Sequence, residues 1–205
     1  MKGRSPEKDP ACLAFNADPV YLTPDCKYFP GFLSADYAST LLARFWSDLE
    51  WQQKPIQLFG RRLLQPRLVC WQGDADAVYG YSGIRLEPEP WHSKMLVLRD
   101  QLQHKLGFCF NSVLANAYRN GQDSMGWHSD DESELGLKPA IASLSLGANR
   151  VFRYRNKQSR ESASVDLEHG SLLLMSGSFQ QEFQHSVPKT SKDKGLRINL
   201  TFRKV

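Results

Sequence analysis

From Phe108 to its end, the chain is a series of short segments that are rich in β-branched residues or alternate between apolar and polar residues. The segments are NSVLANAY, AIASLSLG, RVFRYR, ASVDL, GSLLLMS and LRINLTFRK, with Gly, Asn, Pro and Ser residues between them. No helical pattern separates them, which argues against a parallel sheet with crossover helices. Several short strands in succession predict an antiparallel sandwich, jelly roll or barrel.

Two helices are predicted before this region. Ser34 can cap a helix over residues 35–51, and Gly107 stands just past the end of a second helix that follows Pro90. Apolar residues recur at helical spacing in both: Tyr37, Leu41, Leu42, Phe45, Trp46 and Leu49 in the first, and Trp91, Met95, Leu98, Leu102 and Leu106 in the second. The expected class is therefore mainly β with flanking helices (α+β).

Composition fits one globular domain. The 205 residues are 41% hydrophobic and 23% charged, and residues 1–18, with few large apolar side chains, are expected to form a flexible leader before a single domain over 19–205. No stretch approaches the roughly 20 apolar residues of a membrane helix, and the start lacks the apolar core of a secretory signal. We therefore expect a monomer without a membrane association, in the cytoplasm or, in a eukaryote, the nucleus.

Charge and cysteine usage leave the partner open. The net charge of +4 permits an acidic partner such as nucleic acid without requiring one. The four cysteines form no C-x-x-C pair and are expected to be reduced thiols. A basic run over 150–160 is as compatible with a solvated strand face as with a nucleic-acid footprint.

The segment Trp127-His128-Ser129-Asp130-Asp131-Glu132, expected in a loop, holds the first candidate ligands. His128 and Asp130 are two residues apart, so in extended backbone their side chains leave the same face. Taken alone, H-x-D is a weak signal, because a His and acids in an exposed loop are usually just solvated.

His185, expected just beyond the apolar strand GSLLLMS, supplies the third ligand. Two imidazoles and one carboxylate leave open positions on a metal, which is the arrangement of non-haem Fe(II) oxygenases. The same set could hold a hydrolytic Zn²⁺, and His185 could instead be an ordinary surface or core histidine. The ligands alone do not decide between these readings.

The last strand, Arg197 to Arg203, alternates strictly. Arg197, Asn199, Thr201 and Arg203 share one face, and two guanidinium groups beside an amide and a hydroxyl suit a dicarboxylate. We expect this strand beside the one that carries His185, with Asn116 and Tyr118 reaching the same pocket. The alternative is an edge strand whose polar face lies in water.

Together, N-x-Y, H-x-D-D-E, a distant His and R-x-N-x-T-F-R resemble the AlkB family of 2-oxoglutarate-dependent nucleic-acid demethylases. The resemblance runs from about Leu58 to Val205, with further matches at Pro66-Arg67, Gly73-Asp74 and Tyr81-Ser82-Gly83. It implies a double-stranded β-helix (jelly roll) core over about 108–205 and a nucleotide-recognition lid over about 50–90.

The resemblance also implies roles for single residues. His128, Asp130 and His185 would bind Fe(II), and Asn116, Tyr118, Arg197, Asn199, Thr201 and Arg203 would line the 2-oxoglutarate site. Arg197 would pair with the far carboxylate of 2-oxoglutarate, and Arg203 would lie nearer the metal. The implied reaction uses O₂ and 2-oxoglutarate to oxidise an N-methyl group on a flipped base in DNA, so that formaldehyde, succinate and CO₂ are released.

Four residues are candidates for substrate contact. Tyr81 matches a position that stacks on the flipped base, and Glu132 matches one that contacts the base edge. Phe59 beside Arg61 resembles the finger of AlkB homologues that prefer double-stranded DNA, with an apolar wedge next to a phosphate contact. The plainer readings are a buried tyrosine, an exposed loop acid and a hairpin tip folded onto the core.

Two further hypotheses stay open. The same fold and ligands serve other substrates, so an RNA demethylase or a protein hydroxylase is the first alternative. A catalytically silent nucleic-acid-binding module is the second, and the complete ligand set argues against it.

Overall fold

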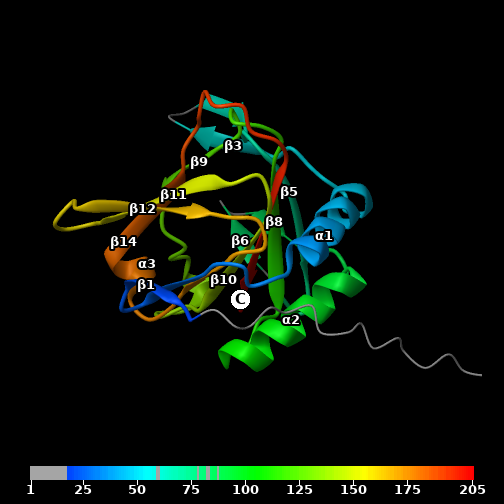
Figure 1. Ribbon diagram of the computed structural model, residues 1–205, viewed down its shortest axis with the longest axis horizontal. Coiled ribbons are helices and arrows are strands. Elements are labelled where there is room, and N and C mark those ends of the chain that lie inside the picture. Colours follow the sequence, from blue (N-terminus) through cyan, green and yellow to red (C-terminus); the bar gives the residue numbers. More distant parts are fainter. Residues whose placement is uncertain (1–17, 59–60, 78, 82–83, 87) are drawn as a thin grey trace, which may run out of the picture.

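The chain folds into two antiparallel β-sheets that face each other, with two helices packed on the outside of the larger sheet (Figure 1). The computed structural model describes residues 18–58, 61–77, 79–81, 84–86 and 88–205. In 56–58, 61–62, 79–81 and 84–86 it describes the backbone alone. The predicted leader falls almost entirely outside the described residues.

The larger sheet has seven strands. In spatial order they are β1 (Val20–Thr23), β2 (Cys26–Phe29), β13 (Leu172–Met175), β10 (Ile141–Gly147), β15 (Arg197–Arg203), β8 (Ser112–Tyr118) and β5 (Leu68–Gly73). The smaller sheet has four: β12 (Ser162–Leu167), β11 (Arg150–Asn156), β14 (Phe183–Val187) and β9 (Met125–His128). Two facing antiparallel sheets of this kind make a jelly-roll core, as predicted.

Two short hairpins and two short helical turns complete the described elements. The hairpins pair β3 (Pro55–Leu58) with β4 (Arg61–Leu64), and β6 (Tyr79–Tyr81) with β7 (Ile84–Leu86). The turns are η1 (Ser133–Leu135), a 3₁₀ helix, and α3 (Phe179–Glu182).

The first predicted helix, α1 (Ala35–Asp48), begins where its capping residue places it. The Ser34 side chain accepts a hydrogen bond from the Tyr37 N–H at 3.4 Å. The helix ends at Asp48 rather than at 51, because Leu49 already has extended backbone. Trp46 was expected on the inner stripe but is 41% exposed, since the buried side follows Ala38, Leu41 and Phe45.

The second helix, α2 (Ser93–Leu106), ends on Gly107, which has a left-handed φ of 73° that glycine adopts without strain. Met95, Leu98 and Leu102 form its buried stripe. In the part of the chain that the structure describes, no helix has the length and apolar character needed to span a bilayer.

Hydrophobic packing occurs in two layers. One lies between the helices and the larger sheet, where Ile198, Leu200 and Phe202 of β15 pack with residues of α1 and α2. The other lies between the two sheets and includes Tyr118 and Phe152. Because side chains alternate along a strand, the polar residues of β15 face into the space between the sheets.

The larger sheet draws on more of the chain than the sequence indicated. The core was predicted over about 108–205, yet β1, β2 and β5 come from before it, and β5 comes from within the predicted lid. β1 pairs with the neighbouring β2, but β2 and β5 also pair with strands distant in sequence: β2 with β13, and β5 with β8. Local pattern carries no information about such pairing.

Candidate metal centre and cosubstrate pocket

His128 and His185 are direct cross-strand partners. His128 is the last residue of β9, and His185 lies in the middle of β14, with their ring centroids 4.2 Å apart. The sequence placed His128 in a loop, whereas it lies on a strand. His185 lies beyond the strand GSLLLMS, as expected. Strand pairing brings the rings together more rigidly than two loops would.

Asp130 completes the group two residues after His128. Its carboxylate oxygens lie 3.9 Å from His128 Nε2 and 3.7 Å from His185 Nε2, and one ligand atom from each residue lies within 4.8 Å of the others. Arg203 Nη2 donates a hydrogen bond of 2.8 Å to Asp130 Oδ1. Burial would raise the pKa of Asp130, but the nearby charges, of which Arg203 is the largest contributor, outweigh it and lower the pKa.

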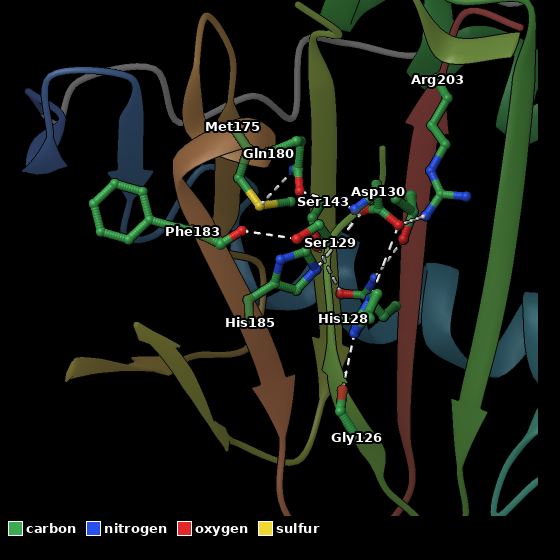
Figure 2. A network of polar contacts seen from close by, with 12 residues as sticks. Gly126, His128, Ser129, Asp130, Ser143, Met175, Gln180, Phe183, His185 and Arg203 are labelled. Atoms are coloured by element: carbon green, nitrogen blue, oxygen red, sulfur yellow. Dashed lines mark hydrogen bonds and ion pairs between the residues drawn. The ribbon is translucent and has the colours of Figure 1, made fainter. Parts of the chain in front are cut away.

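Polar contacts fix the backbone and rings around the three ligands (Figure 2). His128 Nδ1 lies 2.9 Å from the Gly126 carbonyl oxygen. With the Nδ1–H donating to this oxygen, the lone pair of Nε2 is available to bind a metal. Ser129 Oγ donates to the Phe183 carbonyl at 2.9 Å, and the Asp130 N–H donates to Gln180 Oε1 at 3.0 Å. Gln180 was not predicted, because a lone Gln in a short turn carries no recognisable motif.

His185 is held in its neutral form. Its ring stacks on Phe152 at 5.2 Å between centroids, and burial, followed by the proximity of His128, lowers its pKa to about 3. Only a neutral imidazole has a lone pair for a metal. Two imidazoles and one carboxylate, with further positions left open, fit Fe(II).

A cavity extends from the metal ligands between the sheets, and the predicted 2-oxoglutarate residues all line it. They are Asn116, Tyr118, Arg197, Asn199, Thr201 and Arg203, and the three metal ligands border the same cavity. Their strands β8 and β15 are neighbours, with Arg197 opposite Tyr118 and Asn199 opposite Asn116. The polar face of β15 is therefore interior, which excludes the solvated edge strand.

One expectation about β15 was wrong. It was predicted beside the strand that carries His185, but β15 belongs to the seven-stranded sheet and β14 to the four-stranded sheet. Both strands line the cavity, β14 through His185 and β15 through Arg197 and Asn199, so they belong to the two facing sheets. A short separation in sequence does not distinguish a neighbouring strand from a facing one.

Arg197 is the largest fully buried side chain of the described residues, and only part of its guanidinium group is used. Nη2 donates to Ser145 Oγ at 2.9 Å and to Asn199 Oδ1 at 2.8 Å, whereas Nε and Nη1 have no hydrogen-bond partner among the described residues. Burial lowers the pKa of Arg197 to about 10, so the group stays cationic at neutral pH. Buried cationic donors without a partner fit the carboxylate of a bound acid.

Asn199 has an orienting part in the same pocket. Its Oδ1 accepts from Ser143 Oγ at 3.0 Å as well as from Arg197, and its Nδ2 donates to Thr201 Oγ1 at 2.8 Å. Ser143 and Ser145, both from β10, were not predicted. The alternation of β10 places them facing inward, but only its pairing with β15 reveals their partners.

Comparison with known proteins agrees with this geometry. A family model described as the 2OG-Fe(II) oxygenase superfamily matches residues 25–203. The chain is 36% identical over 192 residues to human DNA oxidative demethylase ALKBH2, a match covering 88% of this chain and 73% of that protein. The chain is an AlkB-type member of the 2OG-Fe(II) oxygenase superfamily.

Other relatives extend the comparison. Bovine alpha-ketoglutarate-dependent dioxygenase alkB homolog 3 is 42% identical over 186 residues, covering 86% of this chain and 64% of the relative. The chain thus spans less than two thirds of the length of that relative. The solved structure of OsALKBH1 shares the fold, with a TM-score of 0.63, 20% identity, and coverage of 90% of this chain and all of that one.

A second and larger cavity, of about 240 Å³, adjoins the first at two of the metal ligands, His128 and Asp130, of this AlkB-type chain. It shares Met125, His128, Asp130 and Arg203 with the first cavity. Its remaining lining is Lys54, Gln65, Arg67, Val69, Trp71, Ser112, Leu114, Ser129, Glu132 and Val205. A substrate bound here would lie beside the metal ligands His128 and Asp130.

Of the four predicted substrate residues, the structure places one. Glu132 lines the larger cavity close to His128 and Ser129. Phe59 lies outside the described residues, and for Arg61 and Tyr81 the backbone alone is described. Arg67, in contrast, was not assigned a role but is buried, and its Nε donates to Asn116 Oδ1 at 2.8 Å.

Proposed function

We propose that this protein repairs DNA by direct reversal, removing N-methyl groups from 1-methyladenine and 3-methylcytosine. The observation that carries the proposal is that two cavities meet at one His-Asp-His group, the smaller lined by cationic and polar donors and the larger open to a substrate. The names of the relatives, dioxygenase and DNA oxidative demethylase, support the same reaction class.

In the proposed reaction, bound Fe(II) with O₂ and 2-oxoglutarate supplies the oxidation of the N-methyl group, and formaldehyde, succinate and CO₂ are released. The chain's own residues position the reactants. Arg197 presents its unpartnered Nε and Nη1 to a carboxylate, and Arg203 holds Asp130 in its ionised form. A cosubstrate bound in the smaller cavity would lie between the two facing sheets.

The larger cavity receives the base under this proposal. Glu132 provides a carboxylate beside His128, and a carboxylate favours a cationic methylated base over a neutral one. Flipping a base costs a few kcal/mol, and less when methylation already prevents pairing. Methylated bases would thus be preferred for two reasons: the carboxylate in the cavity, and the lower cost of flipping a base that cannot pair.

The direct test is formaldehyde release from oligonucleotides that carry 1-methyladenine or 3-methylcytosine, in single- and double-stranded form. Turnover is expected only with Fe(II) and 2-oxoglutarate, and should disappear in Asp130→Ala while the surface variant His104→Ala retains it. Absence of turnover on both strand forms would reject the proposal. Equal or faster turnover of methylated RNA would instead favour the RNA demethylase alternative.

Preference for duplex DNA is a separate part of the proposal and rests on the Phe59 motif. Phe59→Ala is expected to lower activity on duplex DNA more than on single strands, because only a duplex needs a wedge between base steps. Equal losses of activity on both substrates would reject the role of Phe59 as a wedge, and would not contradict the proposed demethylation.

A further inference from the structure

Arg150 is a buried arginine outside both cavities. It is the first residue of β11 and only 2% exposed, whereas Arg153, on the opposite face of the same strand, is exposed. In the sequence both belong to one basic run, for which a solvated strand face and a nucleic-acid-binding surface were the two interpretations. Neither interpretation applies to Arg150, since its guanidinium group does not reach solvent.

The guanidinium group of Arg150 donates to three backbone carbonyls. Nη1 bonds Asn120 at 3.1 Å, and Nη2 bonds Asp123 at 2.8 Å and Pro188 at 2.7 Å. Asn120 and Asp123 lie between β8 and β9, and Pro188 directly follows β14. One side chain therefore ties together the ends of three strands that carry site residues.

The same two segments also contact each other directly. The Thr190 N–H donates to the Gly121 carbonyl at 2.9 Å, and Gln122 Nε2 donates to the Thr190 carbonyl at 3.2 Å. Their packing is close, because a Cβ added at Gly121 would lie 2.6 Å from the Thr190 carbonyl oxygen. Arg150 thus completes a rigid junction rather than bridging two independent loops.

This junction borders the cosubstrate pocket through Tyr118. The buried Tyr118 ring has the guanidinium carbon of Arg150 at 5.5 Å from its centroid and that of Arg197 at 5.1 Å. Cation–π contacts of this kind are stronger when they are shielded from water, as both are here. Tyr118 and Arg197 line the cosubstrate cavity and Arg150 does not, so Arg150 would affect a bound cosubstrate indirectly, through these two residues and through its charge.

Positive charge is in excess around Tyr118, which favours the binding of an anion in the pocket. Burial lowers the pKa of Arg197, and the nearby Arg150 adds to this lowering, because the two like charges repel one another. The nearby Asp123 carboxylate is already bonded by the backbone N–H, Nε and Nη2 of Arg119. A dianion in the pocket would relieve this repulsion without touching Arg150.

We propose that Arg150 is a positioning residue for 2-oxoglutarate: it fixes Tyr118 by joining three backbone carbonyls, and it adds positive charge behind the pocket. The proposal rests on the family's use of 2-oxoglutarate and is independent of which polymer is the substrate. Geometry and charge make separate contributions, which two substitutions can distinguish. Lysine keeps the charge but cannot span three carbonyls, and methionine removes both.

The test compares Arg150→Lys and Arg150→Met with Arg153→Met, the matched control on the exposed face of the same strand. The full chain is loaded with Mn²⁺, and calorimetry measures its affinity first for Mn²⁺ and then for 2-oxoglutarate, without nucleic acid. We expect R150K to weaken 2-oxoglutarate binding about tenfold, or about 1.4 kcal/mol, and R150M to weaken it further. Mn²⁺ affinity should be unchanged in both, and R153M should resemble the unmodified chain.

A general loss of structure would weaken Mn²⁺ binding as well, so retained Mn²⁺ affinity separates positioning from misfolding. If R150M does not fold, a double-mutant cycle of R150K with Tyr118→Leu tests the coupling, because R150K should then cost less than in the unmodified chain. Unchanged 2-oxoglutarate affinity in R150K, or an equal loss with and without Tyr118, would overturn the proposal. Neither result bears on whether DNA is the substrate.

Discussion

Arg203 on β15 and Asp130 after β9 form a hydrogen bond of 2.8 Å that joins the two sheets at the metal centre. The same arginine borders both cavities, so one side chain contacts a metal ligand and reaches the cosubstrate and substrate sides. Partners of metal ligands set the ligand's orientation and basicity. The cosubstrate strand and the metal site are therefore expected to respond together to changes at Arg203.

Arg203→Met should weaken Mn²⁺ binding about tenfold in the absence of 2-oxoglutarate, within the range typical of such outer partners. Without the arginine, burial raises the pKa of Asp130, and protons then compete with the metal. The loss should therefore be greater at pH 5.5 than at pH 7.5. Calorimetry at both pH values measures it, with the exposed neighbour variant Lys204→Met as control; an affinity that does not change at either pH would contradict the prediction.

Gln180→Leu should lower the free energy of unfolding by about 1–3 kcal/mol, since it leaves the buried Asp130 N–H without its acceptor. Urea denaturation monitored by circular dichroism gives the value. The control is Gln181→Leu on the same turn. It removes an exposed hydrogen bond to the Leu137 carbonyl, which water can replace, so the change should stay within about 0.5 kcal/mol. Equal effects of the two variants would show that the contact to Asp130 contributes nothing specific.

Local features of this fold were predictable, and long-range pairings were not. Ser34 and Gly107 delimit helices through contacts within a few residues, so their sequence signals hold. The placement of β14 and β15 in different sheets depends on partners distant in the chain. Because a facing strand and a neighbouring strand both bring residues close, the ligand set could be predicted while the arrangement of its strands could not.

The site shows the same division. The roles of the paired arginines and of the His-x-Asp motif could be predicted, because they follow from residue type and spacing. Gln180, Ser145 and Arg150 instead gain their roles from what lies opposite them in the folded chain: a backbone N–H, a guanidinium group and three carbonyls, respectively. No spacing rule identifies such residues before the sheets are paired.

Thiol chemistry offers a check on the core. Burial raises the pKa of Cys26 and of Cys70 to about 12, so at neutral pH both are protonated and shielded, whereas Cys109 is exposed. Since the thiolate is the reactive form, Ellman's reagent should modify Cys109 in the native Cys12→Ser variant and leave the other two intact until guanidinium unfolds the chain. Rapid modification of Cys26 or Cys70 in the native state would contradict the packing described.

Gly121→Ala tests the junction between the β8–β9 and β14–β15 segments. The added Cβ would lie 2.6 Å from the Thr190 carbonyl oxygen and 2.9 Å from that of Lys192, and both are backbone atoms that cannot rotate away. Overpacking of this kind typically costs about 1–3 kcal/mol. We therefore expect the free energy of unfolding to fall by about that amount in urea denaturation.

Gly195→Ala is the matched control for this change, because in the described part of the chain no atom beyond its sequence neighbours lies within 4 Å of its added Cβ. Without a clash, alanine restricts the unfolded chain and should stabilise the protein by up to about 1 kcal/mol. The two glycines thus predict changes of opposite sign from the same substitution. If Gly121→Ala were neutral, the two segments would have room to separate, and the close packing that surrounds the Arg150 side chain would not be required for stability.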